Sequence, residues 1–357
     1  MPPFPLPSLY FNLSNSGFKP KDLITQNSQG QTYLDLDNML SKLKKNNYLT
    51  TALNVDLVTF GFRVKKKNYF SFNLSQNMNF RVRYPKDFMN VLINGNGADG
   101  IIGTEQKFNF GVDMMHYTDV SLGYSRDLND KLTVGGRFKY LMGQENIYSK
   151  KTDVTLTTGV QNFDLTAKSD IAIYTSGLDT NSRLNKNFSA TKYLFNTKNS
   201  GFAIDLGGNY KLNDKWSFSA SVIDLGFIKW KENTKNFISD NPGASVSFSG
   251  VNLKDFINDS TTIEKSAQKT FDSIGKQFAV SERNGSYRSW LNTKIYLSGN
   301  YHINEKNFAG LLLYGQVYDK KIHPAVTVSY NTAIGRWLNA SLSYSMLNRS
   351  YNNVGFG

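Results

Sequence analysis

The stretch at residues 69–84, YFSFNLSQNMNFRVRY, alternates polar and apolar side chains over its whole length. The odd positions are all polar after the first residue: Ser71, Asn73, Ser75, Asn77, Asn79, Arg81 and Arg83. The even positions are apolar apart from Gln76. Strict alternation predicts a strand whose two faces meet different environments. At ~3.3 Å per residue the strand reaches roughly 50 Å, which a soluble sheet rarely needs and a tilted membrane-spanning strand does.

The same period recurs along the chain and predicts an all-β fold. The predicted strands are 8–14, 49–64, 69–84, 106–126, 131–147, 152–160, 163–175, 201–212, 215–230, 289–303, 307–319, 322–331 and 336–347. A fourteenth begins near Gly355. Because single-chain bacterial barrels have even strand numbers, we expect residues 1–357 to be one transmembrane antiparallel up-and-down β-barrel domain of about 14 strands, truncated at the C-terminus.

The composition supports a sheet with one lipid-facing side and one wet side. Hydrophobic residues make up 39 % and aromatic residues 14 % of the 357 residues, and no apolar run is long enough for a helical membrane span. The formal charge of +13 is scattered over turns and alternate strand positions, so we expect no nucleic-acid partner. The chain has no cysteine, which excludes disulfides and thiolate chemistry.

Short turns and long connections mostly alternate between the strands, as in barrels with short periplasmic turns and long outer loops. The long connections lie at about 15–48, 85–105, 176–200 and 231–288. Helical rhythm in three of them predicts helical insertions near 33–45, 85–93 and 252–278. Such helices have two uses that the sequence leaves open, as a plug or cap over the barrel mouth or as packing for neighbouring loops.

Four segments are similar to a known family: LYFNLSNSGF (9–18), GGRFKYLMG (135–143), SVIDLGFIKWKEN (221–233) and SYSMLNRSYNNVGFG (343–357). They resemble an uncharacterised outer-membrane β-barrel family, a domain of unknown function, of Gram-negative bacteria that use type IX secretion. More distantly, they resemble the long-chain fatty-acid transporter barrels. The resemblance implies a place in the cell outer membrane, contact with outer-membrane lipid, and no catalytic residues. Since complete members are expected to carry a signal peptide and further C-terminal strands, we expect this barrel to be incomplete.

No group of residues has the spacing of a catalytic or metal site. The histidines are His116, His302 and His323, and no pair has metal-ligand spacing such as H-x-x-x-H. His302 alternates with the polar set and is expected to face the lumen, whereas His116 has the outward parity near an interface. No serine sits in a G-x-S-x-G elbow or beside a histidine. We therefore expect no catalytic residue, no metal and no cofactor.

Charged residues on the inward parity are the candidates for a lumen lining. They are Arg81, Arg83, Asp113, Arg137, Lys139, Asp205 and Lys294, together with His302. They could form a selectivity lining, or they could pair across the lumen and close it. We prefer the second interpretation because both signs of charge occur.

In SVIDLGFIKW the apolar side chains change from even-numbered to odd-numbered positions between Val222 and Ile223. This change predicts a β-bulge there. We expect Asp224 to satisfy backbone donors at this bulge. Trp230 is expected to mark the aromatic girdle of the barrel.

The sequence therefore predicts a non-enzymatic outer-membrane β-barrel, porin-like or transporter-like. Its partners would be a small, hydrophobic ligand that it passes, or secretion-machinery proteins. The alternative is a soluble or surface-anchored β-rich adhesin, which would bury the outward aromatic face against a second sheet. An outer-membrane hydrolase, with a site assembled from distant strands, is a third reading.

Overall fold

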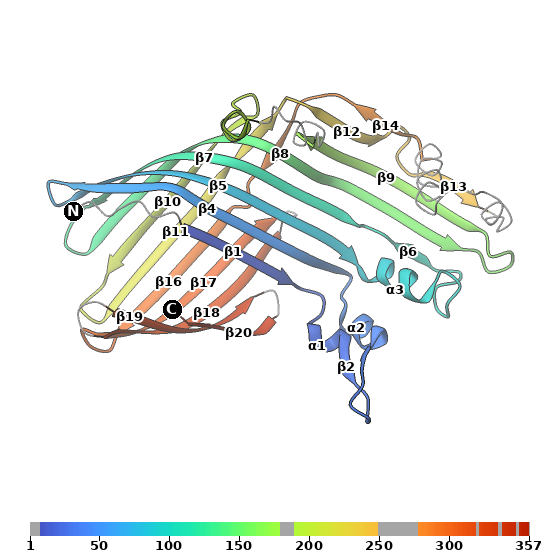
Figure 1. Cartoon of the computed structure of the whole chain (residues 1–357), viewed down its shortest axis with the longest axis horizontal. Helices are drawn as coiled ribbons and strands as arrows, with labels where there is room; N and C mark the ends of the chain where they lie inside the picture. The colour runs from blue at the N-terminus through green and yellow to red at the C-terminus, as the bar shows by residue number, and fades with distance from the viewer. Residues whose placement is uncertain are drawn as a thin grey trace.

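The main sheet is an antiparallel ladder in which each strand pairs with the next (Figure 1). The computed structural model describes residues 8–178, 189–248, 278–318, 321–334, 338–347 and 350–356. The ladder strands are β1 (Ser8–Asn15), β4 (Asn46–Val64), β5 (Asn68–Pro85), β7 (Gly111–Asp127), β8 (Leu132–Thr158), β10 (Ser200–Lys211), β11 (Trp216–Trp230), β16 (Lys294–His302), β17 (Asn307–Tyr318), β18 (Lys321–Ile334), β19 (Leu338–Leu347) and β20 (Ser350–Phe356). Within the described residues, the ladder is thus a twelve-stranded up-and-down wall.

Contacts on the concave side show that the sheet curves back on itself. Tyr48 of β4 packs edge-on against Tyr318 of β17, with ring centroids 5.6 Å apart. The guanidinium of Arg81 on β5 lies 3.8 Å from the centroid of the same Tyr318 ring. Because β5 and β17 are separated by five strands of the ladder, these contacts cross the interior of a barrel. The all-β, antiparallel barrel expected from the sequence is confirmed.

A second group of strands extends this wall at the end where the long connections lie. They are β6 (Glu105–Lys107), β9 (Leu165–Ser176), β12 (Thr234–Ser239), β13 (Ala244–Phe248), β14 (Val280–Arg283) and β15 (Tyr287–Trp290). β9 pairs with the second half of β8 and with β12 and β13, so β8 continues from the wall into the extension.

Several assignments from the sequence are wrong in this region. The predicted strands 131–147 and 152–160 are one strand, β8, because bulges interrupt its alternation without ending its pairing. The predicted long connection 231–288 contains β12, β13 and β14, which are too short to show a clear period. In addition, the predicted strand 289–303 is divided into β15 and β16.

Short helices and one hairpin occupy the long connections. They are α1 (Pro20–Leu23), α2 (Leu36–Lys42), α3 (Lys86–Asn94) and α5 (Ala190–Leu194), with the hairpin β2 (Ile24–Gln26) and β3 (Thr32–Leu34). α2 lies inside the predicted insertion 33–45, and α3 overlaps the one at 85–93. The insertion at 252–278 lies outside the described residues except for Phe278. Among the described helices, none has the length and apolar character to cross a membrane.

The outer face of the wall is apolar and exposed. Its exposed side chains include Phe60, Phe62, Phe70, Leu122, Tyr124, Phe138, Phe202, Leu206, Leu225 and Leu297. The aromatic members near the short turns contact one another across strands, as in the pairs Phe62–Phe70 (5.7 Å) and Phe70–Tyr124 (5.1 Å). An exposed apolar face backed by a polar interior is the arrangement of a transmembrane β-barrel.

The predicted β-bulge is present in β11. The register against β10 shifts between Ile204 and Leu206, so that Asp205 lies opposite both Ile223 and Asp224. Asp224 has a φ of 62°, in the left-handed region that non-glycine residues rarely adopt. The parity change in the sequence therefore located this bulge correctly.

The bulge reverses which residues of β11 face the interior. Beyond it the even-numbered residues point inward, and Ile228 and Trp230 are both 0 % exposed. The prediction that Trp230 belongs to an outer aromatic girdle is wrong, because a one-residue shift in a strand exchanges its two faces.

Gly226 allows the inner face of β11 to approach β10 closely. A Cβ at Gly226 would lie 2.1 Å from the backbone oxygen of Phe202 and 2.5 Å from the Cα of Ala203. We expect Gly226→Ala to lower the free energy of unfolding by about 1–3 kcal/mol, since paired backbone cannot move aside without breaking ladder hydrogen bonds. The measurement is the temperature at which the compact, unboiled band disappears on SDS gels. Gly97→Ala is the control, because a Cβ there meets nothing within 4 Å; equal temperatures for the two variants would contradict the expectation.

Candidate functional site

The inner face of β5 lines three cavities in succession. The loop-end cavity (590 Å³) takes Asn79, Arg81 and Arg83 from β5; the central cavity (320 Å³) takes Ser71, Asn73, Ser75 and Asn77; and the turn-end cavity (450 Å³) takes Tyr69 and Ser71. The polar positions of the first stretch thus face a series of interior spaces that runs from the long connections toward the short turns.

Ion pairs join four neighbouring strands at the central cavity. Lys139 Nζ on β8 lies 2.5 Å from Asp224 Oδ1 on β11 and 3.0 Å from Asp205 Oδ2 on β10. Lys294 Nζ on β16 lies 2.8 Å from Asp224 Oδ2. Arg137 Nη1 is farther from Asp205 Oδ2, at 3.9 Å. Lys139, Asp205 and Asp224 are buried, so the structure brings four of the predicted lining residues together around Asp224.

The bulge orients this group of charges. The backbone N–H of Asp224 donates to Asp205 Oδ1 at 2.9 Å. Within the described residues, the Asp224 carboxylate accepts from Lys139 and Lys294 and from no backbone donor. The predicted role of Asp224 is therefore wrong for its side chain, since Asp205 supplies the acceptor for the turned backbone N–H.

Two carboxylates that the sequence analysis did not select also line the central cavity. Asp119 accepts a hydrogen bond from Asn77 Nδ2 at 2.7 Å, and Asp56 accepts one from Ser75 Oγ at 2.6 Å. Asp119 lies on the inward parity of a predicted strand, so the alternation could have found it. Asp56 precedes a register shift in β4, which obscures its parity. With them, the lining carries three carboxylates and three cationic side chains.

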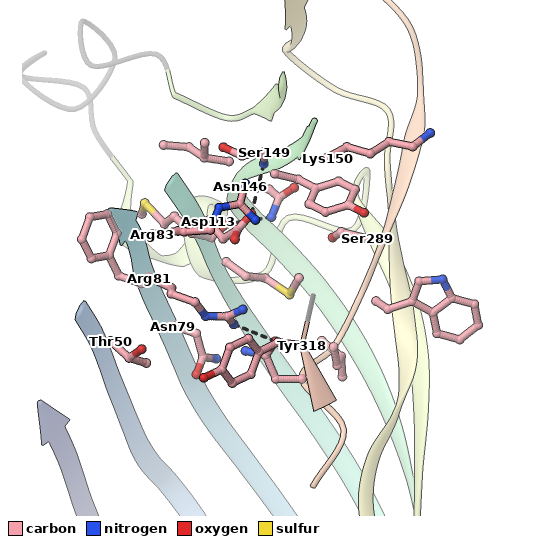
Figure 2. Close-up of a pocket in the computed structure, with 18 of the residues that line it drawn as sticks. Thr50, Asn79, Arg81, Arg83, Asp113, Asn146, Ser149, Lys150, Ser289 and Tyr318 are labelled. Atoms are coloured by element: carbon pink, nitrogen blue, oxygen red, sulfur yellow. Dashed lines mark hydrogen bonds between the residues drawn. The ribbon is translucent and has the colours of Figure 1, made fainter. Parts of the chain in front are cut away.

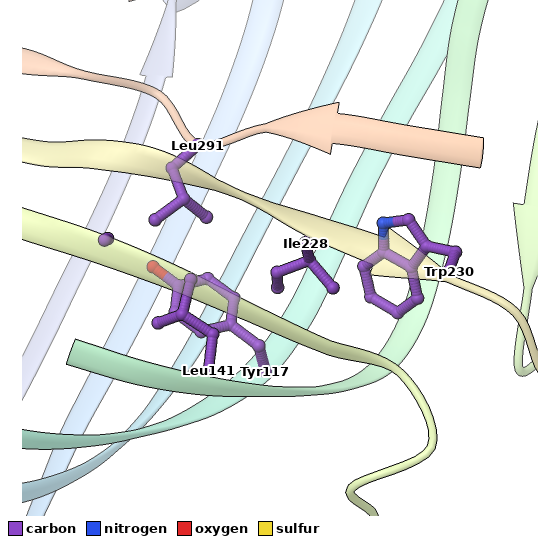
Figure 3. Close-up of a cluster of buried hydrophobic side chains, with 6 residues drawn as sticks. Tyr117, Leu141, Ile228, Trp230 and Leu291 are labelled. Carbon is purple, nitrogen blue, oxygen red and sulfur yellow. The ribbon is translucent and has the colours of Figure 1, made fainter.

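A cluster of buried apolar side chains lies inside the barrel next to these charges (Figure 3). This lumenal apolar cluster consists of Tyr117, Leu141, Ala203, Ile228, Trp230 and Leu291. On β8, Leu141 lies between Lys139 of the central cavity and Asn146 of the loop-end cavity. Trp230 satisfies its indole N–H by donating to Ser289 Oγ at 2.7 Å. An apolar layer therefore lies between the two polar spaces on this side of the barrel.

Arg83 and Asp113 of the predicted set lie in the loop-end cavity (Figure 2). Arg83 donates from Nε to the backbone oxygen of Asn109 at 2.9 Å and from Nη2 to Thr152 Oγ1 at 3.0 Å. Asp113 Oδ1 accepts from the backbone N–H of Ser149 at 3.0 Å. These contacts fix the two side chains to the junction between the barrel wall and its extension.

The remaining two predicted residues lie apart from the central charges. Arg81 lies in the loop-end cavity, where its Nη2 donates to Asn292 Oδ1 at 3.0 Å. His302 ends β16 beside the short turn, with its ring 5.5 Å from Phe308, and it does not line any of the three cavities. The eight candidates therefore fall into two groups and one isolated residue.

A polar patch on the outer face explains the exception at Gln76. His116 has Nε2 at 3.1 Å from Gln76 Oε1 and Nδ1 at 3.0 Å from the Tyr193 hydroxyl of α5. That hydroxyl also donates to Glu145. The side chains of Gln76, His116 and Glu145 therefore lie on the outer face of the wall, where the contacts to Tyr193 anchor α5. In the described part of the chain, no three histidine or carboxylate side chains gather as metal ligands.

Comparisons with known proteins identify a family and distant structural neighbours. The model of a family of unknown function, DUF5723, matches residues 3–357. No curated protein matches the chain. Among solved structures, the toluene transporter TbuX of Ralstonia pickettii is 9 % identical, with a TM-score of 0.38 and coverage of 96 % of this chain and 72 % of that one. The toluene transporter TodX of Pseudomonas putida is 10 % identical, with a TM-score of 0.37 and coverage of 95 % and 72 %.

Proposed function

Because the chain belongs to this family of unknown function, DUF5723, we propose its role from its own geometry: it is a non-enzymatic outer-membrane barrel that passes small, partly hydrophobic molecules. The observation that carries the proposal is the series of three cavities along the inner face of β5. The exposed apolar outer face supports contact with outer-membrane lipid.

The lining of the loop-end cavity supports a solute of mixed polarity. Polar side chains such as Asn79 and Asn146 share it with apolar ones such as Met115 and Leu291. Ligand cavities of about 300–1,000 Å³ with a mostly apolar lining and a few fixed polar groups are typical of small-molecule sites. The carboxylates of the central cavity favour a structural role over acid–base catalysis, since they are paired with lysines or hydrogen-bonded to amides and hydroxyls.

The test is solute entry into liposomes that contain the refolded protein. Phenyl β-glucoside and glucose share a polar group that slows their passage through lipid, and only the first has an apolar part. We expect both solutes to enter these liposomes faster than they enter protein-free liposomes. Phenyl β-glucoside should also enter faster, relative to glucose, than a pore that selects by size alone would allow.

A matched pair of variants locates the path. Leu291→Ala removes most of a side chain that is 5 % exposed in the lumenal apolar cluster, and so opens space inside the barrel. We expect it to raise entry several-fold. Leu297→Ala removes an outward leucine that is 49 % exposed, and entry should be unchanged. No entry with wild type or with Leu291→Ala would rule out passage and favour the other role expected from the sequence, a plugged barrel that serves as a partner of secretion-machinery proteins.

A further inference from the structure

Arg81 is a buried cation that forms no ion pair with a described acidic group. The residue is 7 % exposed. Among the described residues, no carboxylate forms an ion pair with Arg81, and its Nε atom is buried without a hydrogen-bond partner. Burying a guanidinium is unfavourable unless it is paired and its N–H groups are satisfied. An acceptor from outside the protein would supply what this side chain lacks.

The neighbours of Arg81 hold its guanidinium in place and leave it able to bind. One face lies against the Tyr318 ring, at 3.8 Å from the ring centroid, and Nη2 donates to Asn292 Oδ1 at 3.0 Å. Tyr318 is in turn stacked on His323, with ring planes 6° apart. Figure 2 shows Arg81 reaching from β5 toward Tyr318 across the cavity. A guanidinium held in this way loses little further freedom when it binds a planar oxyanion.

The charge of the cavity lining favours an anion. Its charged side chains are Arg81, Arg83, Lys150 and Asp113, which sum to two positive charges. The planar guanidinium matches the two oxygens of a carboxylate, with which it forms paired, charge-assisted hydrogen bonds. The apolar part of the lining, including Met115 and Leu291, fits the body of the same molecule.

We propose that Arg81 binds the carboxylate of a small amphipathic organic anion in the loop-end cavity. This inference rests on the proposed function, because it names the class of solute that the barrel would pass. The volume of 590 Å³ is on the order of twenty water molecules, which suits a carboxylate on one ring or a short apolar body.

The test is calorimetric binding to the folded, detergent-solubilised protein, with benzoate as probe and benzyl alcohol as its uncharged counterpart. We expect wild type to bind benzoate, and Arg81→Gln to weaken that binding by about 10- to 100-fold, the effect of losing charge-assisted hydrogen bonds. Benzyl alcohol should bind more weakly than benzoate and equally to both proteins. Arg63→Gln is the control, since Arg63 pairs with Asp127 at the turn end of the barrel, and its benzoate affinity should equal that of wild type.

Any one of several results would overturn the inference. They are equal benzoate affinity in wild type and in an Arg81→Gln protein that retains the compact gel band, equal affinity for benzoate and benzyl alcohol, and inorganic phosphate binding as tightly as benzoate. If Arg81→Gln does not fold, Arg81→Lys is tested in its place, because lysine keeps the positive charge but lacks the planar guanidinium. An Arg81→Lys protein that binds benzoate as tightly as wild type would then refute the site. Solute entry without benzoate binding would refute this inference alone, and benzoate binding without solute entry would refute the proposed passage alone.

Discussion

Replacing Lys139 by methionine is expected to lower the free energy of unfolding by about 3–5 kcal/mol, because removing one partner of a buried ion pair leaves the other charge uncompensated. Lys139 is 6 % exposed and contacts both Asp224 and Asp205. Without its ammonium, and among the described residues, Asp224 keeps only Lys294 as a cationic partner, and Asp205 keeps only the more distant Arg137.

The free energy is measured by urea unfolding in detergent and compared with the temperature at which the compact band disappears. Lys151→Met is the control on the same strand, because Lys151 pairs with Asp170 at an exposed position. Its unfolding should match that of wild type, since exposed ion pairs contribute little. The double variant Lys139→Met, Asp224→Asn should regain part of the lost stability. A Lys139→Met protein as stable as the control would show that the central charges do not hold the barrel together.

The sequence predicts the faces of the strands well wherever the pairing is regular. In β5, the alternation assigns every inward residue from Ser71 to Arg83 correctly, because the side-chain period of a strand is two. Bulges limit this reasoning, since each one exchanges the two faces of the strand that follows. Trp230 illustrates the error: the bulge before it is visible in the sequence, and the reversal it causes turns an expected girdle residue into a buried one.

The grouping of the site residues is harder to read from the sequence than their orientation. Lys139 and Asp224 are 85 positions apart, and they meet because β8, β10 and β11 are neighbours in the ladder with a specific register. Inward parity alone placed Arg81 and Lys139 in one set. The register assigns Arg81 to the loop-end cavity and Lys139 to the central one, which makes the first a candidate for binding and the second a structural charge.

The second large effect is expected for Trp230→Ala, which should lower the free energy of unfolding by about 3–5 kcal/mol, as large-to-small changes of buried aromatic residues do. The indole is 0 % exposed in the lumenal apolar cluster, and its ring occupies the space that Gly143 leaves open on β8. The variant also leaves Ser289 without the indole N–H that donates to it.

Trp290→Ala is a matched control for this variant. Trp290 lies on β15, which pairs with the same segment of β11, and its side chain is 67 % exposed. Since its removal leaves no internal cavity, we expect urea unfolding in detergent to give a free energy close to that of wild type. If the two tryptophan variants lose the same stability, the interior cluster contributes no more than the outer face does, and the apolar layer inside the barrel does not act as a core. If only Trp230→Ala is destabilised, this barrel is stabilised by a packed apolar interior as well as by its strand pairing and its contact with lipid.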